Sequence, residues 1–280
     1  MKRSFAKYEG LGNDFVVLDG DTWPVEELTS QRAIALCDRH RGVGADGVLW
    51  VQRTSELAAR LIIVNADGTR PEMCGNGVRC VAAFFVDRGW MAQGQTLSLM
   101  TDAGERTVQS RGEHRYAVAM GLLRVESQPF VTLDVRDLRV PVFFADAGNP
   151  HAVVFSEVPL RHREAVAARI RQETQKYPQG TNVEFVSGRA EGGLRVQVHE
   201  RGVGWTLACG TGACAVATVH AAKHTQSQGE TTVELDGGSL EIIWKSAAIS
   251  HLEPTLESTQ DVFETTMIGP AVCVFEGAIS

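Results

Sequence analysis

Two cysteines in near-identical local settings are the residues of this chain best suited to chemistry. Cys74 begins the stretch CGNG, and Cys209 begins the stretch CGTG, each leading into a run that is typical of a helix. Glycines after the cysteine leave the first N–H groups of a helix uncovered, and those groups, with the helix dipole, favour anions. The same field lowers the pKa of a cysteine at that position, so we expect a thiolate near neutral pH.

The two cysteines belong to a longer internal repeat. Cys74 and Cys209 are 135 positions apart. The same spacing separates three further pairs, namely Val48 and Val183, Asn65 and Glu200, and Gln93 and Gln228. Upstream, GNDFVVL from Gly12 and GNPHAVVF from Gly148 correspond at a spacing of 136. We infer that a whole structural unit, rather than a short motif, occurs twice.

Each copy predicts the same order of elements. A strand of branched apolar residues comes first, then a polar amphipathic helix, two strands, the helix after the cysteine, and a hairpin. These elements fall at 14–19, 26–40, 47–51, 60–64 and 78–89 in the first copy, and at 151–155, 160–175, 182–186, 194–199 and 213–224 in the second. The sequence therefore predicts an α/β fold with two pseudo-symmetric domains, each a central helix wrapped by mixed or antiparallel strands. We expect one domain at 1–117 with a returning segment 266–280, the other at 118–265, and an active site in the cleft between them.

Two helix starts that face one cleft suit a reaction at a stereocentre. Inverting a carbon requires a base that removes the Cα proton from one face and an acid that delivers a proton to the other. One cysteine must be a thiolate while the other is a thiol, so their titrations are coupled. The uncovered N–H groups after each cysteine can hold the adjoining carboxylate as negative charge develops. The sequence shows no motif for a cofactor, and we expect none.

The composition favours a small molecule, rather than nucleic acid or a membrane, as the binding partner. The chain has 280 residues and a formal net charge of -7, without a lysine or arginine run that would favour nucleic acid or a membrane surface. No signal peptide or membrane-spanning run is apparent, so we expect a cytoplasmic protein. The sequence leaves the oligomeric state open, with a homodimer as one option. We expect no metal site, and we expect the other four cysteines to be small buried side chains: Cys37, Cys80, Cys214 and Cys273.

Five motifs in order resemble those of the diaminopimelate epimerases, cofactor-independent enzymes that interconvert LL- and meso-diaminopimelate on the bacterial route to lysine and peptidoglycan precursors. They are GLGNDFVVLD, NADG followed by CGNG, GNPHAVVF, GTNVEFV and ERGVG followed by ACGTGACA. The resemblance extends over nearly the whole chain, including GPAVCVFEG near the end. It implies a fold of two pseudo-symmetric α/β domains and an isomerase that uses two cysteines.

The resemblance also implies roles for particular residues. Cys74 and Cys209 match the acid/base pair of the family. The helix-start groups that hold the substrate carboxylate match Gly75, Asn76, Gly210 and Thr211. Substrate-binding residues match Asn13, Asn65, Asn149, Asn182, Glu200 and Arg201, and His151 matches a histidine near the cysteines. Taken singly, the asparagines are also ordinary turn residues, His151 an ordinary buried histidine, and Glu200 and Arg201 ordinary surface charges.

One position departs from the family pattern. The family usually reads ERGVGET, whereas this chain has Trp205 in place of the second glutamate. Trp205 either points away from the pocket or changes the substrate, so a racemase of another amino acid is the nearest alternative. A thiol redox or metal-binding protein is a more distant one. A cysteine-nucleophile hydrolase with His151 or His199 as base gives no reason for a second cysteine in register.

Overall fold

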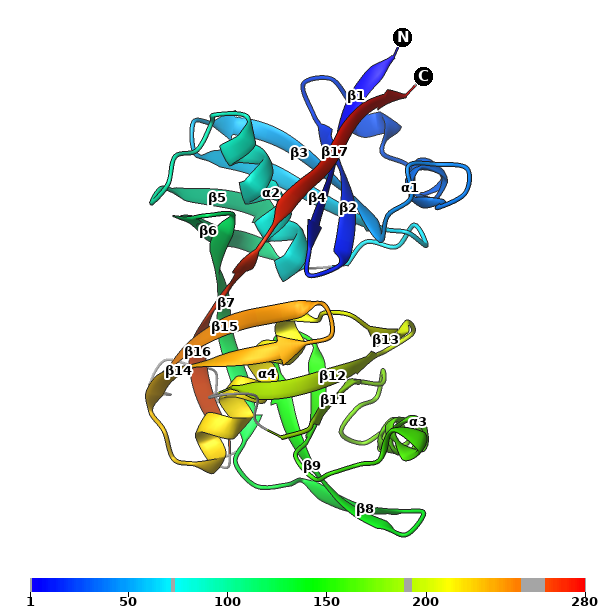
Figure 1. Cartoon of the computed structure of the whole chain (residues 1–280), viewed down its shortest axis with the longest axis vertical. Coiled ribbons are helices and arrows are strands. Elements are labelled where there is room, and N and C mark those ends of the chain that lie inside the picture. The colour runs from blue at the N-terminus through cyan, green and yellow to red at the C-terminus, as the bar shows by residue number, and fades with distance from the viewer. Residues whose placement is uncertain (1, 72–73, 189–192, 248–259, 280) are drawn as a thin grey trace. The chain divides into compact units, whose positions relative to one another are not determined.

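The computed structural model describes residues 2–71, 74–188, 193–247 and 260–279. The chain forms two compact units. The first comprises Met1–Ala119 and Ile268–Ser280, and the second comprises Met120–Met267. Two strands, β7 (Arg115–Glu126) and β16 (Gln260–Pro270), carry the chain from one unit into the other (Figure 1).

The first unit is built mainly from strands. Its helices are the short 3-10 helix η1 (Val25–Glu27), α1 (Ser30–Cys37) and α2 (Gly75–Asp87). Strand β1 pairs antiparallel with both β17 and β2, and β2 pairs parallel with β3. The ladder continues with β3 and β4 antiparallel, β4 and β5 parallel, and β5 and β6 antiparallel. The strand bounds are β1 (Arg3–Gly10), β2 (Asn13–Asp19), β3 (Gly47–Ser55), β4 (Ala58–Asn65), β5 (Thr96–Thr101), β6 (Gly104–Gly112) and β17 (Val272–Ile279).

The second unit contains α3 (Leu160–Ile170) and α4 (Gly210–Lys223). A hairpin of β8 and β9 precedes β10, which pairs antiparallel with β9 and parallel with β11. Then β11 and β12 pair antiparallel, β12 and β14 parallel, and β14 and β15 antiparallel. The strand bounds are β8 (Val131–Val135), β9 (Leu138–Asp146), β10 (Pro150–Val154), β11 (Asn182–Val186), β12 (Leu194–Glu200), β13 (Gly204–Thr206), β14 (Gln228–Leu235) and β15 (Gly238–Ser246).

The two units use one pattern of strand pairing. The sequence β2, β3, β4, β5, β6 pairs parallel, antiparallel, parallel, antiparallel, and β10, β11, β12, β14, β15 does the same. Register also corresponds, since Phe15 lies opposite Gly47 and His151 lies opposite Asn182. The expected mixed α/β fold is confirmed, and equivalent positions of the two units can be compared directly.

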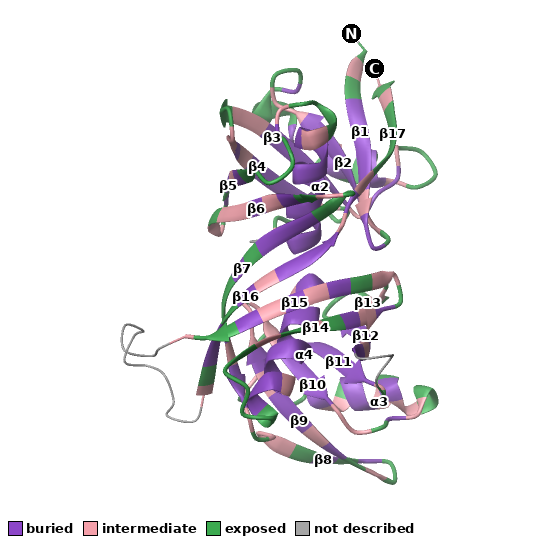
Figure 2. Cartoon of the chain, turned by 60° about the vertical axis from the view of Figure 1, so that its left-hand side comes forward, coloured by how far each residue is buried: buried purple, intermediate pink, exposed green. Residues whose placement is uncertain are grey.

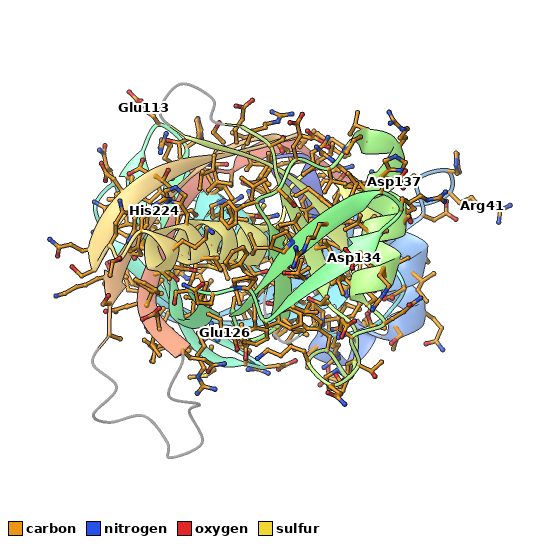
Figure 3. The ribbon with its side chains drawn as sticks, turned by 90° about the horizontal axis from the view of Figure 1, so that it is seen from below. Arg41, Glu113, Glu126, Asp134, Asp137 and His224 are labelled. Carbon is orange, nitrogen blue, oxygen red and sulfur yellow. The ribbon has the colours of Figure 1, made fainter. Side chains whose placement is uncertain are left out.

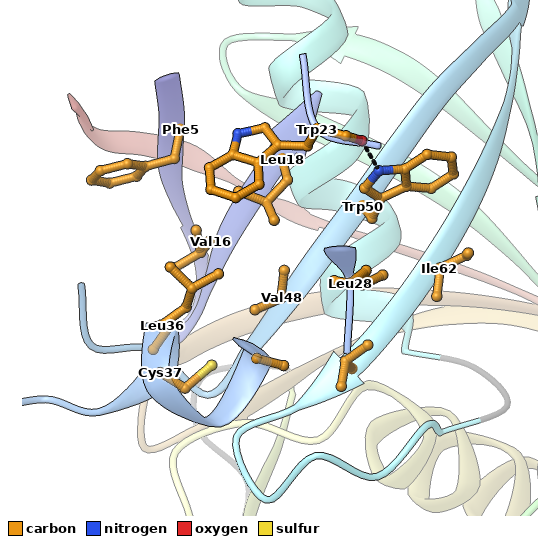
Figure 4. Close-up of a cluster of buried hydrophobic side chains, with 13 residues drawn as sticks. Phe5, Val16, Leu18, Trp23, Leu28, Leu36, Cys37, Val48, Trp50 and Ile62 are labelled. Atoms are coloured by element: carbon orange, nitrogen blue, oxygen red, sulfur yellow. Dashed lines mark hydrogen bonds between the residues drawn. The ribbon is translucent and has the colours of Figure 1, made fainter. Parts of the chain in front are cut away.

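Helices α2 and α4 are the most deeply buried of the described helices (Figure 2). Strands β1, β2, β3, β6 and β17 pack on α2, whereas β9 to β12, β14 and β15 pack on α4. Both helices are therefore apolar on nearly every side, as a helix enclosed by sheet must be. On the other side of the first sheet, a separate cluster packs under α1 and includes Trp23, whose carbonyl accepts the indole N–H of Trp50 at 2.7 Å (Figure 4).

Exposed charged side chains include Asp134 and Asp137 of the β8–β9 hairpin (Figure 3). Within the described ranges, no helix has both the length and the apolarity needed to cross a membrane. Three of the four additional cysteines are buried as expected, but the prediction is wrong for Cys273, which is exposed. It lies on β17, which runs along the surface of the first unit and leaves most of its side chains accessible.

Candidate active site

Cys74 caps the helix that runs through the first unit. Its backbone is extended (φ −141°, ψ 106°), and α2 begins at the next residue. The Gly77 N–H donates to Cys74 Sγ at 3.4 Å, so the sulfur takes the place of a capping oxygen. A Cβ on Gly77 would lie 3.7 Å from that sulfur and 3.0 Å from Leu49 Cδ2. Glycine therefore lets the half-buried thiol sit against the positive end of the helix.

Asn13 and Asn76 form a hydrogen-bonded pair beside Cys74. Asn76 Nδ2 donates to Asn13 Oδ1 at 3.0 Å, and the Cys74 thiol points to the same oxygen at 4.0 Å. Asn13 Nδ2 donates to Asp46 Oδ2 at 2.8 Å. Asn76 is 4 % exposed, and among the described residues its Oδ1 has no hydrogen-bond partner. A buried acceptor without a donor is costly, so this oxygen is suited to a donor on a ligand.

A charged cluster holds Asp46, and through it Asn13. Arg39 bridges the two acids at 2.8 Å each, to Asp14 Oδ1 and to Asp46 Oδ1. Lys7 Nζ also lies 2.8 Å from the Asp14 carboxylate, which is almost buried. Burial alone would raise the pKa of Asp14, but hydrogen bonds from Arg39 and Lys7 lower it overall.

We expect Asp14→Asn to lower the unfolding free energy by about 3 kcal/mol at pH 7, because it leaves the buried Lys7 without its carboxylate and removes one of the two acids that Arg39 bridges. The folded-state pKa of Asp14 is lowered, so its stabilisation is present above the unfolded value of about 4 and is lost as the pH falls through the folded value. Urea unfolding at a series of pH values checks this. The difference between wild type and variant should shrink below pH ~4, and a difference independent of pH would contradict the assignment.

Cys209 caps α4 with the same backbone conformation (φ −135°, ψ 110°) but is more enclosed. It is 7 % exposed, and its Sγ lies 3.5 Å from Thr211 Oγ1. Burial raises the pKa of the Cys209 thiol well above its usual value, and the carboxylates of Glu200 and Glu184 raise it further. The Thr211 hydroxyl and the Gly212 N–H oppose this rise. The expectation of a lowered pKa is therefore wrong for Cys209, because burial and two negative charges outweigh the helix dipole.

His151 forms a buried pair with Glu184 close to the start of α4. His151 Nδ1 lies 2.7 Å from Glu184 Oε1, and both side chains are fully buried. On the other side of the ring, Nε2 lies 3.2 Å from Asn149 Oδ1. A Cβ on Gly212 would lie 2.8 Å from Glu184 Oε1, which places the carboxylate against the first turn of the helix. Asn149 and His151 are thus connected to this helix start through Glu184.

Three more of the expected site residues meet where β11 begins and β12 ends. Asn182 Oδ1 accepts the Arg201 N–H at 2.9 Å. Glu200 Oε1 accepts a hydrogen bond from Thr206 Oγ1 at 2.6 Å. The negative charge of this carboxylate raises the pKa of the Cys209 thiol. The Arg201 side chain is exposed and donates to a main-chain oxygen at 2.9 Å. The structure therefore brings Asn182 and Glu200 to the Cys209 side of the second unit.

Trp205 lies on the opposite face of the strand pair from Glu200. In the β12–β13 register Trp205 is opposite His199, and side chains alternate between faces along a strand. The Trp205 ring contacts His199 and Phe185, with centroids 4.9 Å and 5.9 Å away. It is 47 % exposed. The departure from the family pattern therefore points away from the start of α4.

Asn65 forms hydrogen bonds within the turn that follows β4. It ends β4, its Nδ2 donates to Thr69 Oγ1 at 3.0 Å, and its backbone N–H donates to Thr69 O at 2.8 Å. These bonds close the turn after β4, which is the ordinary chemistry of asparagine at a turn. A role for Asn65 in substrate binding remains a proposal.

Sequence reasoning missed the two carboxylates that support the site, Asp46 and Glu184. Each had a signal. Asp46 directly precedes the buried strand β3, and Glu184 is the one charged residue within the apolar strand NVEFV. An acidic residue in a strand that is buried throughout requires a partner, and for Glu184 that partner is His151. Asp46 is less buried and accepts a hydrogen bond from Asn13.

Comparison with known proteins shows the family. The family model described as diaminopimelate epimerase matches residues 5–125 and 143–253. The chain belongs to the diaminopimelate epimerase family. A diaminopimelate epimerase of Synechococcus sp. (strain JA-2-3B'a(2-13)) is 39 % identical, with 98 % of this chain and 97 % of the relative covered. Diaminopimelate epimerase 1 of Nostoc sp. (strain PCC 7120) is 37 % identical over the full length of both chains.

Solved structures with low sequence identity share the fold of this diaminopimelate epimerase family member. A Bacillus anthracis phenazine biosynthesis protein of the PhzF family aligns with a TM-score of 0.73 at 15 % identity, covering 100 % of this chain and 99 % of that chain. A hydroxyproline epimerase from Agrobacterium vitis aligns with a TM-score of 0.71 at 16 % identity, covering 99 % and 91 %. The mixed α/β fold is therefore of the type found in both the diaminopimelate epimerase and PhzF families.

Proposed function

We propose that the protein interconverts LL- and meso-diaminopimelate without a cofactor, with Cys74 and Cys209 as its acid/base pair. The observation that carries the proposal is the same placement of a thiol at a helix start in each unit. One such thiol suits a nucleophile or an anion site. Two suit a reaction that removes a proton from one face of a carbon and adds a proton to the other. Family membership supports diaminopimelate as the substrate.

The proposed reaction balances with proton transfers alone. In one direction the Cys74 thiolate takes the Cα proton, and the electron pair of the broken C–H bond passes into the adjoining carboxylate. The Cys209 thiol then gives its proton to the opposite face of the carbon. Cys74 ends as a thiol and Cys209 as a thiolate, and the reverse reaction exchanges these roles. The two sulfurs therefore titrate as a coupled pair.

The helix starts supply the electrostatic stabilisation in this proposal. The backbone N–H groups of Gly75 and Asn76 in the first unit, and of Gly210 and Thr211 in the second, bind the carboxylate next to the reacting carbon. Uncovered N–H groups at a helix N-terminus are oriented before the reaction begins, so they stabilise negative charge without reorganising. Exclusion of water around the bound substrate strengthens this stabilisation.

The rest of the substrate offers a second carboxylate and two ammonium groups, and the candidate site has matching groups. Amide oxygens and the Glu200 carboxylate accept from ammonium groups, and the Arg201 guanidinium binds a carboxylate. The Asn76 Oδ1 atom is buried without a donor among the described residues, which supports its use by the substrate. The amides assigned to binding are Asn13, Asn65, Asn76, Asn149 and Asn182.

The direct test of this function is conversion of LL-diaminopimelate by the purified protein, followed by chromatography that resolves the stereoisomers. We expect the mixture to approach equilibrium from either side, and dialysis against EDTA to leave the rate unchanged. The described residues contain no cluster of three acidic, histidine or cysteine side chains placed to hold a metal. A protein that leaves diaminopimelate unchanged but converts another amino acid in a panel would overturn the substrate assignment. A rate abolished by EDTA and restored by a metal would overturn the mechanism.

We expect Trp205→Glu, which restores the usual family residue, to leave the choice of substrate unchanged and kcat/KM within about threefold of wild type. The reason is that Trp205 packs on His199 and Phe185, on the face away from Glu200. The measurement is kcat/KM for diaminopimelate beside a panel of other amino acids. A change in which substrate is preferred would show that Trp205 sets specificity.

Cellular location and oligomeric state follow as further proposals. The sequence has six cysteines, too few for a disulfide framework in a chain of this length, and this supports a reducing compartment such as the cytoplasm. A second copy of the chain is the proposed partner for the exposed part of β17, where Val274 and Phe275 are 50 % and 44 % exposed. Analytical ultracentrifugation of wild type and Val274→Glu checks this. A monomeric wild-type protein would rule the homodimer out.

A further inference from the structure

The repeat allows the environments of the two cysteines to be compared position by position. In the first unit Phe15 and Gly47 are opposite in parallel strands, as His151 and Asn182 are in the second. Leu49 lies two residues after Gly47, and Glu184 lies two residues after Asn182. Leu49 and Glu184 therefore occupy equivalent places.

The helix starts give the same equivalence independently. A Cβ on Gly77, three residues after Cys74, would meet Leu49 Cδ2 at 3.0 Å. A Cβ on Gly212, three residues after Cys209, would meet Glu184 Oε1 at 2.8 Å. Both side chains thus face the first turn of a cysteine-capped helix, but one is an alkyl group and the other a carboxylate.

At these equivalent places the two units therefore differ in the chemistry of one pair of side chains. Phe15 and Leu49 are both apolar and buried, whereas His151 and Glu184 form a hydrogen bond of 2.7 Å between fully buried side chains. A buried ionisable pair seldom stabilises a fold more than an apolar pair of similar size does. The first unit shows that this place in the fold can be filled by an apolar pair, so the stability of the fold does not account for the polar pair.

The pair fixes a proton and a charge. A carboxylate only accepts, so Glu184 Oε1 takes the N–H of His151 Nδ1 and holds the ring with Nε2 toward Asn149. The second carboxylate oxygen, Oε2, is buried and has no hydrogen-bond partner among the described residues. The carboxylate thus lies against the first turn of α4, the helix that Cys209 caps.

Resting on the proposed function, we propose that Glu184 is a positioning residue that gives the two cysteines different protonation states. It keeps the Cys209 thiol protonated in the resting enzyme, and it orients His151 toward Asn149. The groups that act on Cys209 from its own unit are Glu184 on β11, Glu200 on β12, and Thr211 and the Gly212 N–H on α4. Both carboxylates disfavour a second negative charge at the sulfur. The resting enzyme is then set for the direction in which Cys209 delivers its proton.

The first test measures Cys209 without any substrate, so it is independent of the proposed function. In a Cys74→Ala background, the rate of iodoacetamide alkylation of the Cys209 peptide is followed by mass spectrometry against pH. We expect Glu184→Gln, which keeps the shape and an acceptor for His151, to move the midpoint for Cys209 to lower pH. Alkylation at pH 8 should be about tenfold faster, as loss of one nearby charge predicts. Glu157→Gln, at an exposed acid of the same unit, is the control and should not change the midpoint.

The second test uses the complete enzyme and its pH profile. If Cys209 is the last of the two sulfurs to lose its proton, Glu184→Gln moves the alkaline limb of kcat/KM to lower pH by about one unit and moves the acidic limb less. Glu184→Leu, which copies Leu49, should shift the same limb and also raise KM, since His151 loses its partner. The proposal would be overturned if folded variants kept both the wild-type midpoint for Cys209 alkylation and the wild-type pH profile of kcat/KM. An equal shift of the acidic and alkaline limbs would also overturn it. Failure of the wild type to convert diaminopimelate would instead refute the proposed function.

Discussion

Replacing either Cys74 or Cys209 by alanine is expected to lower kcat for epimerisation by at least about 10³-fold. Each variant removes the acid or the base in both directions, because the thiols exchange roles when the reaction reverses. General acid or base catalysis contributes about 10² to 10⁴-fold, and each variant removes one of the two groups assigned to it. Stereoisomer-resolved rates from both substrates measure the effect.

The cysteine variants have a matched control in Cys273, which is an exposed thiol on β17. Cys273→Ala should keep full activity, and unfolding temperatures should show that all three variants fold. A folded Cys74→Ala or Cys209→Ala variant that epimerises at the wild-type rate would remove that cysteine from the mechanism. Loss of activity in only one of the two would favour a reaction with a single base.

Removing the amide pair beside Cys74 is expected to have the next largest effect. Asn76→Ala and Asn13→Ala should each lower kcat/KM about 100-fold, since each removes a hydrogen-bonding group worth about 2 to 3 kcal/mol when its partner is charged. In Asn76 the lost atom is the buried Oδ1, and in Asn13 it is the oxygen to which the Cys74 thiol points.

The double variant gives the sharper test of this pair. Asn76 donates to Asn13 at 3.0 Å, so each single substitution already breaks their shared bond. The loss in the Asn13→Ala/Asn76→Ala variant should therefore be smaller than the two single losses combined. Strict additivity would mean that the two amides act separately. An unchanged kcat/KM in both single variants would exclude them from the binding site.

The repeat was the feature of the sequence that predicted most of the arrangement. A constant spacing between Cys74 and Cys209 and their surroundings placed both thiols before a helix, and each indeed caps one. The apolar run after each cysteine predicted the two buried helices, because a helix enclosed by strands carries few polar residues. Periodicity did not indicate the β8–β9 hairpin or strand β1, whose places depend on pairing partners distant in sequence.

Long-range contacts explain what the sequence did not predict at the site. The pKa of Cys209 depends on burial and on Glu184 and Glu200, which come from two different strands. The support of Asn13 by Asp46 spans 33 positions, and that of His151 by Glu184 spans 33 as well. Local motifs identified the residues that resemble those of the family. The supporting carboxylates, Asp46 and Glu184, could be assigned only from the strand pairing in the structure.

The most direct test of the two-base account is the fate of the hydrogen at the inverted carbon. LL-diaminopimelate is converted in heavy water, and at low conversion both the product and the remaining substrate are analysed by mass spectrometry. If one cysteine removes the proton and the other delivers a proton from solvent, the product carries one deuterium at the inverted carbon and the remaining substrate carries none. A product that retains the hydrogen of the substrate would contradict opposed acid and base, and with it the central claim that Cys74 and Cys209 serve one carbon.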